Sequence, residues 1–195
     1  MKEKLILIGA GGHAKSCIDV IELEDKFTIS GLIDIKEKIG NQVLNYPIID
    51  HDENLFKYVE NHFFLITIGQ IKSPEIRINL FNKLSKLNAK FATIISPLAY
   101  VSKYSKIDEG SIIMHHAIIN ANSFIGKNCI INSKALIEHD CEVGNHCHIS
   151  TASVLNGNVK IGDCSFVGSN SVIVNNLSLA KNSFIKSNQL IKNDQ

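Results

Sequence analysis

The strongest constraint on the fold of this chain is an aliphatic residue at every sixth position from Ile95 to Ile191, seventeen positions without a miss. The residue four places after each of them is nearly always small, and Val159, Leu177 and Gln189 are the departures. A helix repeats every 3.6 residues and a simple strand every 2, so a period of six fits neither. A sustained period of six is typical of a solenoid of short strands and corners. We therefore predict a β-helix of hexapeptide repeats over residues 91–195.

The period also predicts the geometry of the β-helix. One aliphatic residue in six points into a narrow prism, a small residue fits the tight corner, and three units close a triangular coil. Residues eighteen apart should therefore stack at about 4.8 Å, the spacing of neighbouring strands. An ordinary β-sandwich would show period-2 alternation and turn signals about every 8–12 residues. Neither pattern is present.

The first ninety residues follow a different pattern. Apolar runs typical of strands alternate with segments of helical periodicity. Such alternation favours a small parallel α/β sheet, and we predict a Rossmann-like domain over residues 1–90. The expected strands are Leu5–Ile8, Phe27–Ile33 ending at Asp34, and Phe63–Ile68; the expected helices are Lys15–Leu23, Asn54–Asn61 and a segment opened by Ser73 and Pro74 that runs to about Leu87.

Composition excludes several classes of function. A net charge of +1 provides no basic stripe for nucleic acid. Lys2 and Lys4 before Leu5–Ile8 imitate a signal peptide, but the apolar run stops at Gly9 without an adequate hydrophobic region or cleavage pattern. We interpret it as the first strand of a cytoplasmic protein and predict no membrane partner.

The segments His139–Cys141 and His146–His148 resemble the ligand pattern of a zinc site when they are read along the sequence. Cys141 and Cys147 lie one hexapeptide apart, so the coil should place them at two different corners, where they cannot share an ion. Cys129 and Cys147 are eighteen apart and should stack as buried thiols. We predict no metal site.

The segment Gly9–Ala14 has the form G-x-G-x-x-A, and Asp34 ends the second strand where the ribose-binding acid of a Rossmann unit would lie. Such glycines let backbone N–H groups approach a pyrophosphate at a helix N-terminus. About ninety residues leave no room for the full sheet and substrate domain of a nicotinamide enzyme. A nucleoside diphosphate carried by the substrate is the favoured ligand, and a loop used only for packing is the alternative.

These motifs together resemble a known family. A small Rossmann-like domain with the loop Ile8–His13, joined to a β-helix carrying Ile137–Cys141 and Gly157–Gly162, resembles the bacterial sugar O-/N-acetyltransferases of the PglD and NeuD type. The resemblance implies a left-handed, homotrimeric β-helix with acetyl-CoA between adjacent subunits. It further implies N-acetylation of a UDP- or dTDP-linked 4-amino-4,6-dideoxy sugar for surface glycan synthesis. The alternatives are sialic acid O-acetylation, a non-catalytic scaffold and a nicotinamide-binding redox module.

Residue roles follow from the coil and from the resemblance. His139 lies two places after the inward Ile137 and should face outward, where an imidazole can accept a proton from an attacking amine. The resemblance gives it that role and makes Asp140 the residue that orients it. Asp140 is shorter than the Glu familiar in relatives, and Glu138 is a local competitor. Gly157 should stack over His139, leaving room for the thioester and offering its N–H to the oxyanion.

The resemblance also implies binding residues. They are His148 near the thioester, Asn132 near the acceptor sugar, Gly9, Gly11, Gly12 and His13 on the diphosphate, Asp34 on the nucleobase or ribose, and Gly69 with Gln70 lining the nucleotide site. A structural role is the alternative for His148 and Asn132. Packing or solvent contact is expected for His115 and His116.

The chain departs from the family pattern at its end. The family commonly finishes with a Gly-x-Pro-Ala segment that helps to cover CoA, whereas this sequence ends with Leu190–Gln195. We expect either that CoA is held without that tail or that another subunit covers it.

Overall fold

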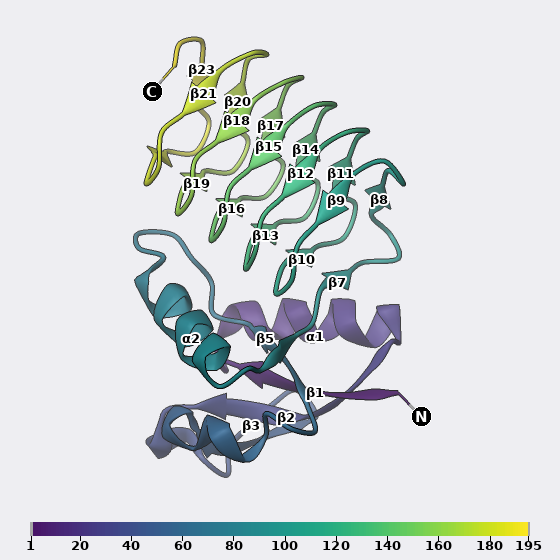
Figure 1. The fold of residues 1–195 in the computed structure, drawn as a ribbon, viewed down its shortest axis with the longest axis vertical. Helices are drawn as coiled ribbons and strands as arrows, with labels where there is room; N and C mark the ends of the chain where they lie inside the picture. The colour runs from purple at the N-terminus through teal and green to yellow at the C-terminus, as the bar shows by residue number, and fades with distance from the viewer. Residues whose placement is uncertain (1, 195) are drawn as a thin grey trace. The chain divides into compact units, whose positions relative to one another are not determined.

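The computed structural model describes residues 2–194, which divide into two compact units (Figure 1). The first unit contains the residues up to Gly69 together with Glu75–Ala92. The second contains the residues from Thr93 onward and also the short segment Gln70–Pro74. The segment 70–74 is thus grouped with the repeats, although it lies between two elements of the first unit in sequence.

The first unit is built on a six-stranded sheet in the order β3-β4-β2-β1-β5-β6. All neighbouring strands are parallel except β3, which pairs antiparallel with β4. From β1 the chain first builds β2, β3 and β4 on one side of β1, and then crosses over to build β5 and β6 on its other side. The strand order therefore reverses at β1, and α/β folds bind ligands at such a topological switch point. The elements are β1 Glu3–Ile8, α1 Gly12–Glu24, β2 Phe27–Asp34, η1 Lys36–Lys38, β3 Gln42–Val43, β4 Tyr46–His51, η2 Asp52–Lys57, β5 Phe63–Ile66, α2 Glu75–Lys86 and β6 Lys90–Phe91.

The pattern of the sequence predicted most of these elements. The three predicted strands are confirmed as β1, β2 and β5. The predicted helix over residues 15–23 is confirmed as α1, and the helix predicted after Ser73 and Pro74 is confirmed as α2. The helix expected over Asn54–Asn61 is instead a shorter 3₁₀ helix, η2. Strands β3 and β4 were not predicted, because β3 has two residues and Pro47 interrupts the apolar run of β4.

Burial explains why β1 is central. Its residues Leu5–Ile8 are all nearly inaccessible to solvent, as expected of a parallel strand covered on both faces. The segment after β5 is held by Arg77 of α2, which is itself buried. Its Nη1 donates hydrogen bonds to the carbonyl oxygens of Ile66 at 2.8 Å and Ile68 at 2.7 Å. This buried cation fixes the carboxyl end of β5 beside that of β1.

The second unit is a left-handed parallel β-helix. The period of six predicts the β-helix, and the family resemblance implies its left hand. Its strands have two residues each and form three sheets. The first sheet holds β7 Ile94–Ile95, β10 Ile112–Ile113, β13 Ile130–Ile131, β16 His148–Ile149, β19 Phe166–Val167 and β22 Phe184–Ile185. The second holds β8 Tyr100–Val101, β11 Ile118–Ile119, β14 Leu136–Ile137, β17 Val154–Leu155, β20 Val172–Ile173 and β23 Leu190–Ile191. The third holds β9 Lys106–Ile107, β12 Phe124–Ile125, β15 Glu142–Val143, β18 Lys160–Ile161 and β21 Ser178–Leu179.

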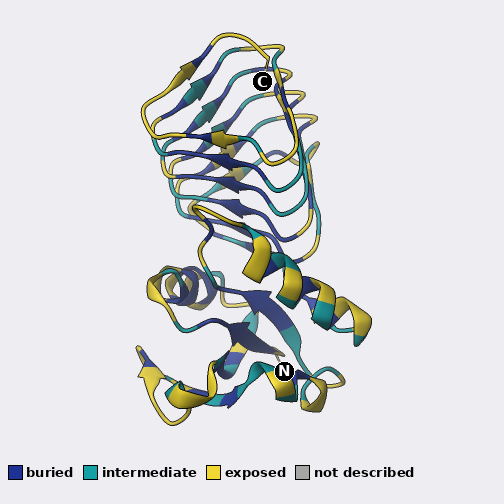
Figure 2. Cartoon of the chain, turned by 90° about the vertical axis from the view of Figure 1, so that its left-hand side faces the viewer, coloured by how far each residue is buried: buried dark blue, intermediate teal, exposed yellow. Residues whose placement is uncertain are grey.

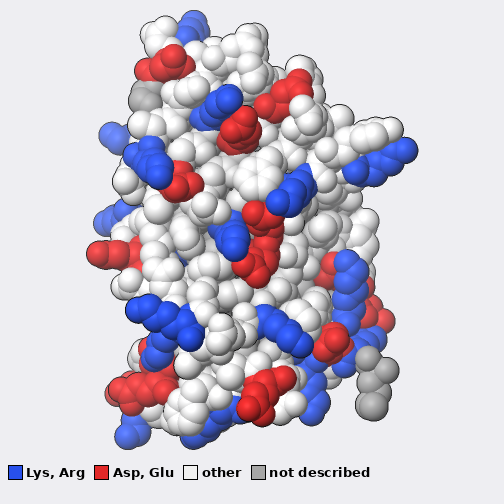
Figure 3. Space-filling view, viewed as in Figure 1, with Lys and Arg blue, Asp and Glu red and all other residues white. Residues whose placement is uncertain are grey.

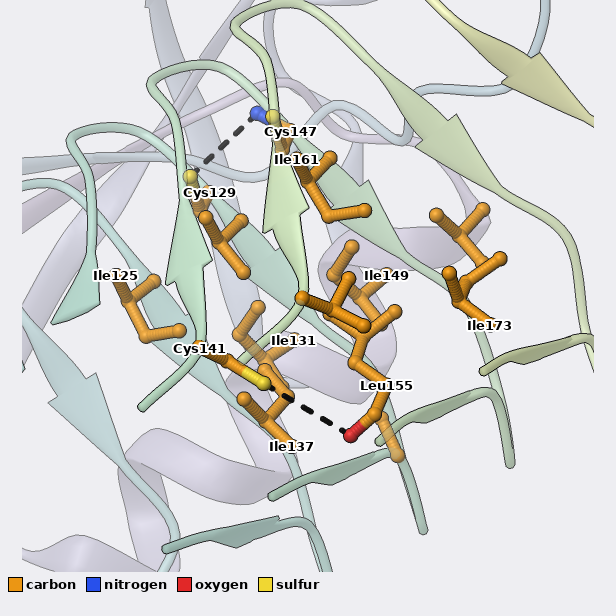
Figure 4. Packing of buried hydrophobic residues seen from close by; sticks show 14 of the residues in the cluster. Ile125, Cys129, Ile131, Ile137, Cys141, Cys147, Ile149, Leu155, Ile161 and Ile173 are labelled. Carbon is orange, nitrogen blue, oxygen red and sulfur yellow. Dashed lines mark hydrogen bonds between the residues drawn. The ribbon is translucent and has the colours of Figure 1, made fainter. Parts of the chain in front are cut away.

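The register between coils is eighteen residues in every ladder. Ile131 pairs with Ile149 and Ile137 with Leu155, for example, and these inward side chains are inaccessible to solvent (Figure 4). Figure 2 shows buried segments recurring from coil to coil along the β-helix. The small residues fill the prism beside them. The Cys147 N–H donates to Sγ of Cys129 at 3.4 Å, which confirms that these two thiols stack (Figure 4).

The tight corner is made by a different residue from the one expected. A residue with left-handed backbone, φ near +60°, recurs every sixth position, and the small buried residue comes directly after it. Asn tolerates this conformation better than other residues with a side chain, and it fills most of these positions. The positions are His116, Asn122, Asn128, Lys134, Asp140, His146, Ala152, Asn158, Cys164, Asn170, Asn176, Asn182 and Asn188.

Three further findings concern surface charge, membrane-spanning helices and metal ligands. On the face shown in Figure 3, cationic and anionic side chains are interspersed and neither sign gathers into a patch. In the part of the chain that the structure describes, no helix combines the length and hydrophobicity that a bilayer crossing requires. Over the same residues, His, Cys, Asp and Glu side chains form no group of three or more suited to a metal ion.

Candidate active site

His139 and Asp140 form the corner that follows β14 and precedes β15. His139 is exposed over 63% of its side chain, as its position two places after the inward Ile137 predicts. Its Nδ1 lies 2.7 Å from Oδ2 of Asp140. The aspartate therefore reaches the imidazole despite being shorter than a glutamate.

Asp140 is held on its other side by the preceding coil. Nδ2 of Asn122, eighteen residues earlier, donates a hydrogen bond to Oδ1 of Asp140 at 2.7 Å. This hydrogen bond, followed by the contact with His139, lowers the pKa of Asp140. An ionised carboxylate only accepts hydrogen bonds, so Nδ1 of His139 must carry the proton and the neutral ring keeps its free lone pair on Nε2. Glu138 does not compete, because its carboxylate accepts from Asn120 Nδ2 at 2.9 Å.

Gly157 stacks on His139 from the next coil, as the register predicts. A Cβ at position 157 would lie 2.7 Å from Cε1 and 2.8 Å from Nε2 of the imidazole. The ring thus occupies the space that a side chain would fill, and Gly157 is buried beneath it. Glycine at this position therefore makes room for the imidazole itself, and the role of its N–H toward an oxyanion stays a prediction.

The histidine faces an open hollow with a volume of about 790 Å³. Its lining comes from this corner and from the adjoining third sheet in several successive coils, and it is mostly polar. The lining residues are Asn122, Phe124, His139, Asp140, Glu142, Asn158 and Asn176.

His148 and Asn132 lie together in a different part of the β-helix, on the first sheet. The carbonyl oxygen of Gln70 lies 2.5 Å from Nδ1 of His148, so that nitrogen must donate. Oδ1 of Asn132 accepts from the N–H of Ser133, which turns its Nδ2 toward Nε2 of His148 at 3.1 Å. Both ring nitrogens are thus engaged in the neutral tautomer, and His148 is buried.

This network also anchors the segment that begins at Gln70. Nε2 of Gln70 donates to the carbonyl oxygen of His146 at 2.9 Å, and the whole Gln70 side chain is buried. The second unit therefore supplies structural partners for His148, Asn132 and Gln70. None of these contacts involves the corner of His139. Their roles toward acetyl-CoA, the acceptor sugar and the nucleotide stay predictions.

In the first unit, the glycines of the loop after β1 differ in what surrounds them. Gly9 has φ +106°, and a Cβ there would lie 2.3 Å from Cγ1 of Ile68, so packing requires this glycine. No atom lies within 4 Å of a Cβ at Gly11 or Gly12, where α1 begins. Those two positions leave space that the protein does not fill. His13 lies in the first turn of α1, and a Cβ at Gly69 would be 3.6 Å from its Cβ.

Asp34 contacts this loop directly. Its Oδ2 accepts the N–H of Ala10 at 2.6 Å, while Oδ1 accepts the N–H of Ile35 at 2.8 Å and lies 3.0 Å from Nζ of Lys38. Burial alone would raise the pKa of Asp34, but these hydrogen bonds and the Lys38 ammonium outweigh it and lower the pKa. The carboxylate thus braces the glycine loop, a role that sequence reasoning missed, and its contact with a ribose or base stays a prediction.

A cavity of about 300 Å³ opens at the carboxyl ends of β1, β2 and β5. Sequence reasoning identified Gly9 and Asp34 in its wall but missed the face of α2 and Asp52. The spacing i, i+3, i+4, i+7 in α2 was the available signal. The lining residues are Ile8, Gly9, Ile33, Asp34, Ile35, Asp52, Ile68, Ile76, Asn79, Leu80 and Lys83.

Comparisons with known proteins agree with this arrangement. Residues 4–84 match the family of the PglD N-terminal domain. A variant of perosamine N-acetyltransferase from Caulobacter crescentus, solved in complex with CoA and GDP-perosamine, has a TM-score of 0.91 at 27% identity, covering 98% of this chain and 89% of that one. The first unit is of the PglD N-terminal type. The acetyltransferase domain of PglB from Neisseria gonorrhoeae FA1090 has a TM-score of 0.90 at 25% identity, covering 99% of this chain and 93% of that domain.

Sequence comparison adds a Bacillus subtilis relative of this chain. UDP-N-acetylbacillosamine N-acetyltransferase is 29% identical over 115 residues, which is 57% of this chain and 51% of that protein. The chain spans 22% and 51% of the length of the curated relatives that it matches.

The contact between Gly157 and His139 predicts the effect of one added methyl group. Gly157→Ala would place a Cβ against the imidazole, which can rotate away because it is exposed. We expect catalytic activity to fall by about 10–100-fold, the effect of a misplaced catalytic group, with the melting temperature nearly unchanged.

Asn175→Ala is the matched control, because Asn175 is exposed and lies one coil further along the same corner. Steady-state kinetics and thermal melts of both variants make the comparison. Full activity in Gly157→Ala would show that the position of the ring on Gly157 is irrelevant.

Proposed function

We propose that this chain is an acetyltransferase of the PglD type, which transfers the acetyl group of acetyl-CoA to the amine of a nucleotide-linked 4-amino-4,6-dideoxy sugar. The observation that carries the proposal is the His139–Asp140 pair, fixed by Asn122 and Gly157 of the adjacent coils. The structural relative with bound CoA and GDP-perosamine and the Bacillus relative support this substrate class. Because the bound relative holds a GDP sugar, GDP joins UDP and dTDP among the nucleotides to be tested.

The geometry supports a direct transfer. The neutral amine of the sugar attacks the thioester carbonyl carbon, a C–N bond forms and the C–S bond breaks. The proton of the amine moves to Nε2 of His139, and the CoA thiolate leaves and takes up a proton. Ionised Asp140 stabilises the resulting imidazolium through Nδ1. Acetyl-CoA is consumed as a co-substrate, and no metal takes part in this scheme.

The acceptor's nucleotide is assigned to the first unit. The open space at Gly11 and Gly12 lies where the N–H groups of the first turn of α1 are exposed to a ligand. Such groups at a helix N-terminus bind phosphate well. His13 belongs to the same turn, and Gly69 lies beside it. We place the diphosphate there.

We also assign the reaction to the cytoplasm, because the five cysteines are free thiols, including the stacked pair Cys129 and Cys147.

A homotrimer is part of the proposal, because the hollow beside His139 is wide open in a single chain. The second sheet, which contains β14, presents an apolar outer face, whereas the outer face of the third sheet is mostly polar or charged. The outward residues of the second sheet are Tyr100, Ile118, Leu136, Val154, Val172 and Leu190; those of the third are Lys106, Phe124, Glu142, Lys160 and Ser178. An unpartnered apolar face beside the histidine is suited to a second copy of the chain.

The trimer is testable at the two faces. We expect the wild type to sediment as a trimer at micromolar concentration. Val154→Glu on the apolar face should dissociate it, because a charge buried in an interface is costly, while Ser178→Glu on the polar face should leave it intact. A monomeric wild type, or equal sedimentation of both variants, would contradict the proposed interface.

Removing the imidazole tests the general base. His139→Ala should lower the rate of CoA release by about 10²–10⁴-fold, the usual contribution of a positioned general base. The affinity for CoA and the trimer mass should stay nearly unchanged, because the side chain is exposed at a corner. The assay uses UDP-, dTDP- and GDP-linked amino sugars, and sialic acid as the rival acceptor.

The control is His116→Asn, because His116 is an exposed corner histidine whose left-handed backbone Asn readily adopts. Its activity should match that of the wild type. If His139→Ala keeps more than about a third of the activity, the base must lie elsewhere.

Adding a side chain at Gly11 tests the diphosphate site. Gly11 has φ −88°, which a valine tolerates, and its Cβ position is empty, so Gly11→Val should fold normally. We expect the acceptor KM to rise at least about tenfold, equivalent to roughly 1.4 kcal/mol. The KM for acetyl-CoA should change less than about twofold, because CoA is assigned to the β-helix. A larger effect on acetyl-CoA, or none on the acceptor, would revive the sialic acid alternative.

A further inference from the structure

A separate cavity of about 230 Å³ lies in the second unit, where the segment 70–74 meets strands β19 and β22 of the first sheet and the corner before them. It shares no lining residue with the hollow beside His139. The volume is below the usual range for drug-sized ligands. It therefore suits a molecule of one or two rings.

Two stacked aromatic rings line this cavity. Phe166 of β19 and Phe184 of β22 pair in register, with ring centroids 5.2 Å apart and ring planes inclined by 20°. Phe166 is buried, whereas Phe184 exposes 49% of its surface, and Ile71 in the segment 70–74 exposes 63%. Covering such apolar surface is favourable, and an aromatic ring prefers another ring in an offset-stacked or edge-to-face arrangement. Phe184 and Ile71 therefore favour a flat aromatic occupant.

The side-chain amide of Gln70 supplies a polar group at the same cavity. Gln70 is almost completely buried. Its Nε2 donates to the carbonyl oxygen of His146 at 2.9 Å, which fixes the orientation of the amide, because the reverse orientation would bring two acceptor oxygens together. Within the part of the chain that the structure describes, Oε1 of Gln70 has no hydrogen-bond partner. A buried acceptor without a partner costs free energy, which a ligand carrying an N–H donor would recover.

The segment 70–74 is anchored at one end and exposed beyond it. Gln70 is held by its side chain, which bonds His146, and by its carbonyl oxygen, which accepts from Nδ1 of His148. The next three residues, 71–73, are exposed. Oε1 is shielded from solvent, so a donor reaches it when these exposed residues move aside while the anchor stays in place.

We propose that this cavity is a binding site for a small planar aromatic molecule with an N–H donor, which lies against Phe184 and bonds Oε1 of Gln70. Because the carbonyl oxygen of Gln70 also accepts from His148, an occupant stabilises the network of His148 and Asn132. The site is independent of the proposed acetyl transfer, since it uses neither the His139 corner nor the first unit.

Indole and benzofuran separate the two features of the site, because they have nearly the same shape and only indole has an N–H. Titrations of the full-length protein, followed by NMR of its isoleucine methyl groups, should show saturable binding of both, with indole about three- to tenfold tighter. Gln70→Leu should reduce this ratio to about one, because the acceptor is lost. Phe184→Ala, a change at an exposed position, should weaken both probes alike and leave the ratio unchanged.

Cys164 shows where the probes bind. It lines the cavity and is half-buried, whereas the other four cysteines are buried. Burial raises the pKa of the Cys164 thiol, so alkylation with iodoacetamide is carried out at alkaline pH. Saturating indole should slow the alkylation of Cys164 several-fold, as measured by mass spectrometry of the cysteine peptides.

Tyr104→Ala is the matched control for Phe184→Ala. Tyr104 is an exposed aromatic residue that does not line the cavity, so the probe affinities of this variant should equal those of the wild type. Indole that does not bind, or that binds without protecting Cys164, would overturn the site. Equal affinities of indole and benzofuran for the wild type would overturn the role of Gln70. The titrations contain neither acetyl-CoA nor an acceptor sugar, so their failure would leave the proposed function standing.

Discussion

The backbone hydrogen bonds between coils fix everything else in the β-helix. Each strand pairs with the strand eighteen residues away in strict register, from β7 to β23. Because no residue is inserted between Ile95 and Ile191, a side chain on one coil has a fixed neighbour on the next. The candidate active site is one product of this register, since Asn122, His139 with Asp140, and Gly157 come from three successive coils.

The corners explain why functional residues can occupy this repetitive fold. The turn residues face outward and leave the core unchanged, so one corner can carry His139 and Asp140 while its neighbours carry Asn. The left-handed conformation favours Asn at these positions, and the amide of Asn122 is available to bond the carboxylate of Asp140. A residue chosen for backbone conformation thus also lowers the pKa of a neighbouring group.

The sequence predicted the features that depend on local period. The β-helix, the outward His139, its stacking with Gly157 and the contact of Cys129 with Cys147 all follow from counting in sixes and eighteens. Contacts between segments far apart in sequence could not be predicted in this way. The bond from His148 to Gln70 and the bond from Ala10 to Asp34 join residues whose separation has no period. Strand β4 was not predicted for a local reason, because Pro47 interrupts its apolar pattern.

The central claim is that the register places the proton of the neutral His139 ring on Nδ1 and leaves Nε2 free. Nitrogen-15 NMR of the protein with labelled histidine measures this tautomer directly at neutral pH. The predicted result is a protonated Nδ1 and an unprotonated Nε2 for His139 in the wild type, with loss of this preference in Asn122→Ala combined with Asp140→Ala. A proton on Nε2 of the wild-type ring, or the mixture of tautomers found in free histidine, would contradict it.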